Sequence, residues 1–343
     1  MSGFHHTSVQ DLCATGAAAL AKGPVAAIFA EDEAELGTTL RHHITLGFAS
    51  VIAFMPRSFA LPDDVTAKVV RVDHDLANGG HVAAINALIS ATPTGTWMYY
   101  CFNAEYLFYP FCETRSIGEM LAYHAEERRD AMLTYVVDIY AGDLDRDPSA
   151  VTLKDAWMDK SGYYALARKD PDNHNHPKER QLDFFGGLRW RYEEHIPTPR
   201  RNIDRIAIFR AKVGLELREG HTFNDEEYNT YACPWHNNLT AAIASFRTAK
   251  ALKRNPDSTF DIHTFKWHNS TQSSGIHANC WIWALWSRGN GSSLCLSPVL
   301  DSQTSDVSNP VVCSKILALH AQMLQHVFAR SHNRVPRSTH RRR

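Results

Sequence analysis

Short strand-like apolar segments alternate with helix-like segments along the first third of this chain, and this alternation is its strongest constraint on fold. Between the first two segments, Leu36, Leu40 and Ile44 recur at a helical spacing, and Gly47 follows as a helix end. Strands that are apolar on both faces and alternate with helices are typical of a parallel sheet covered on both sides. We therefore predict an α/β fold with a mostly parallel central sheet flanked by helices. The strand-like segments are 25–30, 50–54, 68–72 and 96–102.

Further elements are predicted downstream, so that residues 24–271 form one domain behind an N-terminal extension, residues 1–23. Ser116 and Glu119 form a capping box ahead of a helix. The polar segment 143–177 is expected to contain a helix or two at most. The other expected elements are a small-residue helix at 82–89, strands at 132–140 and 205–210, an amphipathic helix at 238–252 and a strand-like segment at 259–267.

Composition excludes several classes of protein. The 343 residues carry 36 Lys and Arg against 37 Asp and Glu, and 44% are hydrophobic. This balance excludes global disorder and a histone-like nucleic-acid binder, so we expect no nucleic-acid partner. The chain has no run of about 18 apolar residues, so we predict no transmembrane segment, and no secretory signal is visible. Seven scattered cysteines without CxxC spacing argue against a disulfide framework, so a cytoplasmic location is expected.

The last part of the chain, residues 272–343, has a different composition. It contains no Glu and only two Asp, but it has eight Lys or Arg and three of the eight Trp. We predict a tail of low order. One hypothesis is an out-of-frame product, because codons permitted for residues 273–291 can be read one frame over as EWHSRQLLDLGLMEPGQW, which has a helical leucine periodicity. Sequencing the coding DNA decides between this hypothesis and a genuine basic tail.

The exit of the fourth predicted strand carries the first candidate site. Asn103 and Glu105 follow a buried strand at a spacing of two residues. Amide and carboxylate oxygens are the ligands that Mg²⁺ and Mn²⁺ prefer, and such cations bridge the phosphates of nucleotides. The alternative is structural: Asn103 caps a turn and Glu105 faces water.

Three further segments carry polar side chains that are candidate site residues. The acidic run 31–35 after the first strand, which includes Glu33, either suits a helix N-terminus or contacts a nucleotide. Arg189 follows two glycines that either permit anion contact or form a plain turn. His221 precedes Asp225 and Glu226, so the histidine is a candidate metal ligand and the carboxylates are candidate general bases. Ordinary surface or core roles are the alternative for all of these.

The order and spacing of several segments resemble bacterial family-2-like glycosyltransferases over residues 24–271. The resemblance implies an A-type glycosyltransferase fold, of the nucleotide-diphospho-sugar transferase kind, with Mg²⁺ or Mn²⁺ on the donor diphosphate. Glu33 matches the acidic residue after the family's first strand, Glu105 matches its metal motif, and His221 resembles a late metal ligand. The matching segments are VAAIFAEDEAEL with HHITLGF, FNAEYLFYP, QLDFFGGLRWRYEEHIP, IAIFRAKVGLELREGHTFNDEEYNTYACPWHNNL and FKWHNS.

The chain departs from the family pattern on the donor side. Asn103 stands where an aspartate is usual, and residues 55–59 replace an acidic, serine-rich turn. An amide ligand lacks the charge that offsets a cation, so metal affinity should fall. Asp73 and Asp75, after the third strand, are expected to compensate by contacting the nucleotide.

These observations predict a glycosyltransferase that moves a sugar from a nucleotide-sugar donor to a glycan or another hydroxyl acceptor. A non-catalytic nucleotide- or carbohydrate-binding relative is the alternative, and a histidine-rich metal-dependent hydrolase is a third interpretation. The expected roles are catalysis for Asp225 or Glu226, donor binding for Glu33, Asp73, Asp75 and Arg189, and metal binding for Asn103, Glu105 and His221.

Overall fold

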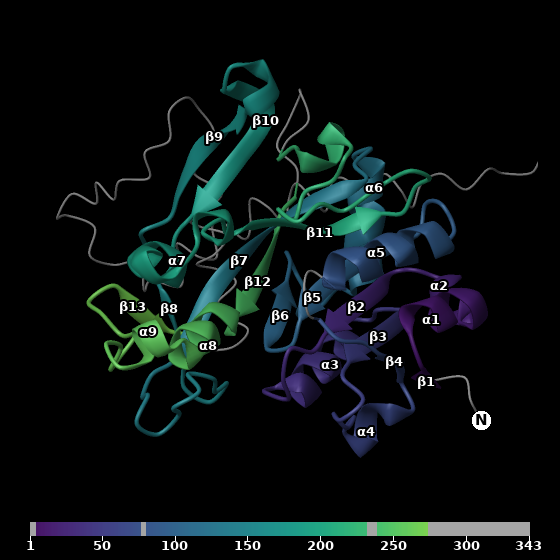
Figure 1. The fold of residues 1–343 in the computed structure, drawn as a ribbon. Coiled ribbons are helices and arrows are strands. Elements are labelled where there is room, and N and C mark those ends of the chain that lie inside the picture. Colours follow the sequence, from purple (N-terminus) through teal and green to yellow (C-terminus); the bar gives the residue numbers. More distant parts are fainter. Residues whose placement is uncertain (1–4, 77–79, 232–238, 274–343) are drawn as a thin grey trace, which may run out of the picture. The chain divides into compact units, whose positions relative to one another are not determined.

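The computed structural model describes residues 5–76, 80–231 and 239–273 (Figure 1). The chain divides into two units, Met1–Leu296 and Ser297–Arg343, and every described residue belongs to the first. The described part is an α/β fold with a large mixed sheet flanked by helices. Apart from residues 272 and 273, the predicted tail lies outside the described residues.

One half of the sheet is parallel, as predicted. Its strand order is β4, β3, β2, β5, and each neighbouring pair is in parallel register. Strand β2 is buried at every position, which explains its unbroken apolar sequence. At the outer edge, β1 (His5–His6) pairs with β4, so part of the predicted N-terminal extension belongs to the sheet. The parallel strands are β2 (Val25–Phe29), β3 (Ser50–Met55), β4 (Val69–Asp73) and β5 (Trp97–Phe102).

Helices lie on both faces of this half (Figure 1). The connection from β2 to β3 runs across the sheet in the opposite direction to the connection from β4 to β5. Right-handed crossovers therefore place α3 and α5 on opposite faces. Side-chain contacts agree, since His43 of α3 stacks on Tyr99 while His81 of α5 contacts Phe102. The helices are α1 (Val9–Thr15), α2 (Ala17–Leu20), α3 (Leu36–Thr45), α4 (Asp63–Thr66), α5 (Gly80–Ala91) and α6 (Ile117–Glu126).

The other half of the sheet is mixed. After β5 the order continues β11, β7, β12, β6, with β11 antiparallel to both of its neighbours and β12 parallel to β7. Strand β6 is antiparallel to β12 and closes this path. The carboxyl ends of β2, β5, β7 and β12 therefore share one edge of the sheet, which we call the carboxyl edge. The strands are β6 (Glu105–Phe108), β7 (Ala131–Ala141), β11 (Asp204–Arg210) and β12 (Ala241–Ser245).

A short connection forces this half of the sheet to curl. Strand β5 ends at Phe102 and β6 begins at Glu105, so their facing ends are at most about 11 Å apart. In the sheet order, however, β6 is four strand spacings from β5, which would be roughly 19 Å in a flat sheet. The sheet must therefore bend around the carboxyl edge, and Glu105 lies where the bend closes.

Smaller elements extend beyond the main path. Strand β8 pairs with β7 and with β13, and β9 and β10 form a separate antiparallel hairpin. These elements are β8 (Ala156–Asp159), β9 (Tyr164–Asp170), β10 (His176–Phe185), β13 (Ser270–Gln272), α7 (Leu188–Arg191), α8 (Arg247–Arg254), α9 (Pro256–Thr259) and the 3₁₀ turns η2 (Pro171–Asn173), η3 (Glu193–His195), η4 (Thr198–Arg200) and η5 (Glu226–Asn229).

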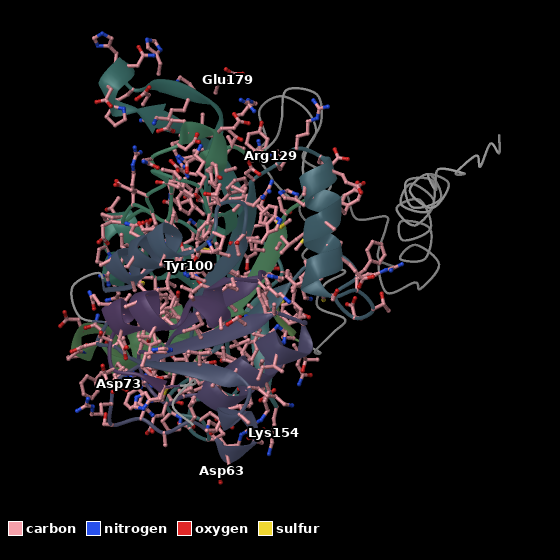
Figure 2. All side chains as sticks on the ribbon, turned by 90° about the vertical axis from the view of Figure 1, so that its right-hand side faces the viewer. Asp63, Asp73, Tyr100, Arg129, Lys154 and Glu179 are labelled. Carbon is pink, nitrogen blue, oxygen red and sulfur yellow. The ribbon has the colours of Figure 1, made fainter. Side chains whose placement is uncertain are left out.

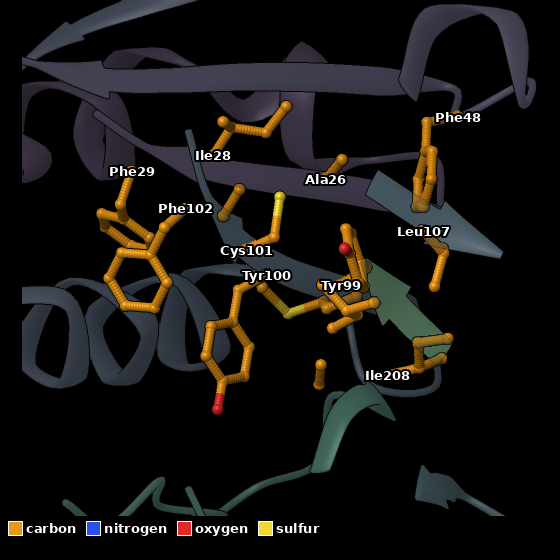
Figure 3. Close-up of a cluster of buried hydrophobic side chains, with 14 of the residues drawn as sticks. Ala26, Ile28, Phe29, Phe48, Tyr99, Tyr100, Cys101, Phe102, Leu107 and Ile208 are labelled. Atoms are coloured by element: carbon orange, nitrogen blue, oxygen red, sulfur yellow. The ribbon is translucent and has the colours of Figure 1, made fainter. Parts of the chain in front are cut away.

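The core fills both sides of the central strands (Figure 3). Phe29 stacks on Phe54 with ring centroids 4.8 Å apart and lies beside Phe102. On the opposite face, Phe48 packs against Tyr99. No helix in the described part of the chain has the length and apolarity needed to cross a bilayer.

Three predicted elements are wrong. Residues 241–245 form β12, and only the short α8 follows, because small apolar side chains fit a strand buried between β7 and β6 as well as they fit a helix. The described segment 259–267 contains no strand. Segment 143–177 holds the short buried strand β8, strand β9 and the start of β10, and the half-exposed sequences of β9 and β10 lack a clear apolar alternation.

Candidate functional site

The carboxyl edge between β2 and β5 is a topological switch point. From β2 the chain moves outward through β3 and β4, and it then returns to the other side of β2 as β5. In open α/β sheets, the crevice outside the carboxyl ends at such a point is the usual ligand site. The side chains that follow β2 and β5 therefore lie where sheets of this kind usually bind ligands.

Asn103 ties these two strand ends together. Its Oδ1 accepts the backbone N–H of Glu31 at 2.9 Å, and its Nδ2 donates to Asp32 Oδ1 at 2.7 Å and to the carbonyl of Ala34 at 2.9 Å. The side chain is fully buried, and all of these contacts lie within the turn after β2. Asn103 is therefore a structural link between the two strands.

Glu105 forms a buried ion pair with Arg205 of β11. Arg205 donates to both carboxylate oxygens, at 2.7 and 3.1 Å, while Phe102 N and Ser245 Oγ supply two further hydrogen bonds. Burial favours the neutral acid, but Arg205 overcomes it and lowers the pKa of Glu105 to about 2. Glu105 is thus an anion at neutral pH with a complete set of protein partners.

Arg247 is a partly accessible cation of this edge. It is the first residue of α8, its side chain is 30% exposed, and its guanidinium lies 3.6 Å from the centroid of the Phe102 ring. Nε and Nη2 donate to the carboxylate of Glu31 at 2.6 to 2.9 Å. Nη1 has no hydrogen-bond partner among the described residues. Arg247 therefore has a face available to a ligand.

Two histidines from other elements lie near Arg247 and Arg205, whose charges act on both rings. His221 bonds Tyr100 Oη through Nδ1 at 2.9 Å, and its ring lies 5.5 Å from that of His81 in α5. Burial, reinforced by the positive charges of Arg247 and Arg205, lowers the pKa of His81 to about 4. Burial also holds the pKa of His221 well below its usual value. Both imidazoles are therefore neutral at pH 7.

Asp138 and Arg189 complete the group. In register, Asp138 of β7 lies beside Ser245 of β12, which in turn lies beside Glu105 of β6. Arg189 donates its backbone N–H to Asp138 Oδ2, and its Nε lies 3.5 Å from Oδ1. Burial raises the pKa of Asp138, although Arg189 opposes the rise. Oδ1 of this buried side chain accepts no hydrogen bond within the described structure.

We call these side chains the carboxyl-edge cluster. Lys250 and Arg254 flank it by pairing with Asp32. Counted with these flanking groups, five cationic side chains face four carboxylates, so the edge has a positive excess. The cluster consists of Glu31, His81, Glu105, Asp138, Arg189, Arg205, His221 and Arg247.

The predicted cation ligands do not fit a metal ion as they are placed. Both Glu105 oxygens are already occupied by Arg205 and two other donors, and Asn103 Oδ1 is occupied by a backbone N–H. Across the described ranges, no group of three or more His, Cys, Asp or Glu side chains could hold a metal ion. The metal role expected for Asn103, Glu105 and His221 is therefore not supported, although the three residues do lie near the same strand ends.

The predicted donor-binding residues are only partly brought together. Arg189 belongs to the cluster, whereas Glu33 and Asp75 are exposed in turns after β2 and β4. Asp73, at the end of β4, pairs with His5, Arg57 and Arg71 at 3.1 to 3.2 Å. Figure 2 shows Asp73 and Tyr100 in different parts of the molecule.

The predicted bases lie elsewhere. Asp225 pairs with Lys212, just beyond Arg210, where β11 ends beside the start of β5. This is the edge opposite to the carboxyl edge. Glu226 accepts from Gln181 at 2.8 Å and pairs with Lys178, both in the β9–β10 hairpin. A base role for either residue is therefore not supported, because neither contacts the cluster. Their proximity to His221 in sequence was misleading.

Several residues of the cluster were missed from the sequence. Asp138 was detectable, because it is the one charge within a strand that is otherwise apolar at 131–141. Arg205 opens a predicted strand, so its burial was not evident. His81 and Arg247 carry no local signal, because each acts through partners from distant segments.

A separate cavity of about 500 Å³ lies at the opposite edge of the sheet. Its lining includes Pro24 and Trp97 at the starts of β2 and β5, together with Leu121 of α6 and Arg210. It contains no carboxylate or imidazole, so it offers less chemistry than the carboxyl edge.

A scan of the chain against protein-family models gave no match, and a search among curated proteins gave none either.

Proposed function

We propose that the chain is a glycosyltransferase that takes a sugar from a nucleotide-sugar donor and passes it to a glycan or another hydroxyl acceptor. The observation that supports this most is the position of the carboxyl-edge cluster. Together with the flanking Lys250, Arg254 and Asp32, the cluster has a positive excess. It also holds neutral imidazoles and a buried carboxylate at the topological switch point of a parallel half-sheet. A nucleoside diphosphate is the type of ligand that such an edge binds in other α/β proteins.

The cations would stabilise the departing diphosphate. Negative charge develops on the leaving phosphate during glycosyl transfer, and fixed positive groups at that place lower the barrier. Arg247 and Arg189 come from separate elements and are held by Glu31 and Asp138, so their positions are set before the donor arrives. We assign them the donor diphosphate.

Asp138 is the carboxylate we assign as the base that deprotonates the acceptor hydroxyl. A raised pKa suits a group that must accept a proton, and Asp138 Oδ1 accepts no hydrogen bond, with Arg189 Nε 3.5 Å away. The buried side chain lies against Gly187, where an added Cβ would come within 3.1 Å of Asp138 Oδ2. This glycine has a φ of 63°, so a larger residue there is doubly disfavoured.

A non-catalytic nucleotide- or carbohydrate-binding relative is the second candidate. The complete hydrogen bonding of Glu105 and Asn103, which removes the expected cation ligands, favours it. The histidine-rich hydrolase receives no such support, since the described residues contain no metal-binding group. Cytoplasmic location remains part of the proposal. Cys13 and Cys101 are free thiols.

The experiment is a donor screen on the full chain. UDP-, GDP- and dTDP-sugars are tested for a rise in melting temperature and for slow release of nucleoside diphosphate. For the enzyme, we expect one donor class to do both, and Asp138→Asn to keep the thermal shift while losing most of the release. The binding relative predicts a shift without release for the unmodified chain. If no donor produces either signal, both candidates are wrong.

A further inference from the structure

The place expected for a divalent cation is filled by a guanidinium group. Arg205 reaches Glu105 with two nearly parallel N–H···O bonds, which is the fork geometry that arginine makes with carboxylates. Both partners are almost wholly inaccessible, with side-chain exposures of 2% and 0%. A cation could reach the carboxylate only by displacing Arg205 into a buried position without a partner, which is costly.

Among the cations of the cluster, Arg247 is the most exposed, at 30%, against 13% for Arg189. Arg247 uses Nε and Nη2 for Glu31, which leaves Nη1 for a ligand. Its guanidinium plane is held against the Phe102 ring, so its orientation is fixed. Arg189 is held by Asp138, Thr248 and the carbonyl of Asn202. Guanidinium groups fixed in this way suit the paired oxygens of phosphates.

The imidazoles add donors without adding charge. Nε2 of His81 is buried and has no hydrogen-bond partner in the described structure. The free ring nitrogen of a neutral imidazole either accepts or donates according to its tautomer, so it can serve a phosphate oxygen or hydroxyl. The His81 ring meets the Phe102 ring edge-on, with centroids 5.3 Å apart, and the charge of Arg247 acts on it.

We propose that the carboxyl-edge cluster binds the diphosphate of its donor through arginine side chains, chiefly Arg247, without a divalent cation. Arg205 takes the place of the cation by neutralising Glu105, and Arg247 supplies the positive charge that meets the ligand. This inference rests on the proposed function, because it names how the same site would hold its donor.

The test measures nucleotide binding by calorimetry on the full chain, with UDP, GDP and dTDP as probes. Each is titrated once with EDTA and once with MnCl₂. We expect at least one nucleotide to bind in EDTA, with a dissociation constant that Mn²⁺ changes by less than about threefold. Arg247→Gln should weaken binding by about tenfold or more, since it removes a charge-assisted hydrogen bond. Electron paramagnetic resonance should show that added Mn²⁺ stays free.

The matched control is Arg41→Gln, which breaks an exposed ion pair with Asp64 away from the cluster and should leave binding unchanged. Circular dichroism verifies that both variants are folded. Binding that requires Mn²⁺, or that Mn²⁺ strengthens by tenfold or more, overturns this inference and leaves the proposed function standing. Equal binding by the unmodified chain and Arg247→Gln overturns the role of Arg247. If none of the three nucleotides binds in either buffer, the proposed function fails together with the inference.

Discussion

At the scale of single residues, the sequence identifies Asn103 and Glu105 as special but not their roles. Both follow a buried strand at the switch point, as predicted, yet one links two turns and the other pairs with Arg205. That partner is 100 positions away in the sequence. Local spacing can locate a carboxylate on a strand, but it cannot show whether a distant guanidinium occupies it. For the same reason, Asp225 looked adjacent to His221, although its contacts are at the other edge.

The first prediction concerns the buried pair. Because the pKa of Glu105 is about 2 in the fold and its ordinary value is 4.5, ionised Glu105 stabilises the fold above about pH 4.5. This contribution is lost as the pH falls towards 2. Glu105→Gln should lower the free energy of unfolding by about 3 kcal/mol at pH 7, because it leaves Arg205 buried without its anion. Urea denaturation measures the change.

The double variant Glu105→Met with Arg205→Met is the control for that measurement. Replacing both charges by apolar groups of similar size removes the unpaired cation, so most of the lost stability should return. If the loss of unfolding free energy in the double variant equals the sum of the losses in the two single variants, the two side chains do not pair directly. Arg41→Gln, in an exposed pair, should cost less than about 1 kcal/mol.

At the scale of elements, the sequence predicts the helices and strands that hydrophobic periodicity and helix capping determine. The alternating strands and helices of the parallel half were predicted at nearly their observed bounds, and the capping box of Ser116 and Glu119 is confirmed. The exception is β12. Its sequence AAIAS fits a helix locally, and only its position between two other strands decides the outcome. Long-range pairing of this kind has no local signature.

The second prediction tests the cap of α6. Ser116 Oγ accepts from the backbone N–H of Glu119, and the Glu119 carboxylate accepts in return from the Ser116 N–H at 2.9 Å. Ser116→Ala should lower the free energy of unfolding by about 1 kcal/mol. Ser90→Ala, at an exposed position in the last turn of α5, is the control and should be neutral or slightly stabilising, because alanine is the better helix former. Equal losses in the two variants would exclude a capping effect.

At the scale of the whole molecule, burial keeps several histidines neutral. Burial, with His42 adding to it, lowers the pKa of His43 to about 3, and burial lowers that of His124 to about 4. His81 and His221 are lowered in the same direction. These residues lie on different elements and on both faces of the sheet. Histidines are usually considered as ligands or bases, but here most of the depressed values come from packing.

The third prediction follows from these shifts. Each depressed histidine stabilises the fold fully above its ordinary pKa of 6.5, and this contribution is lost as the pH falls towards the folded value. The free energy of unfolding should therefore fall by up to about 1.4 kcal/mol per pH unit for each such histidine. Asp204, whose pKa burial raises to about 6, opposes part of this trend. Urea denaturation between pH 7 and 5 measures the slope.

His43→Gln isolates one contribution to that slope. His43 is fully buried and bonds the Thr39 carbonyl, so its variant should be less stable at pH 7 and should show a slope smaller by about one proton. Arg41→Gln, at an exposed position, is the control and should leave the slope unchanged, because arginine keeps its charge throughout this pH range. An unaltered slope in His43→Gln would mean that this imidazole is not kept neutral by the fold.

The two residues between β5 and β6 have a consequence for how the molecule can change. They close a ring of five strands, β5, β11, β7, β12 and β6, because they bring the end of β5 next to the start of β6. Because this connection has only two residues, the ring of strands cannot widen unless hydrogen bonds between the strands break. The number of residues at this point is therefore dictated by geometry, whereas the tip between β9 and β10 is free to lengthen. Any rearrangement that makes Arg247 more accessible must therefore come from the helices and turns around these five strands.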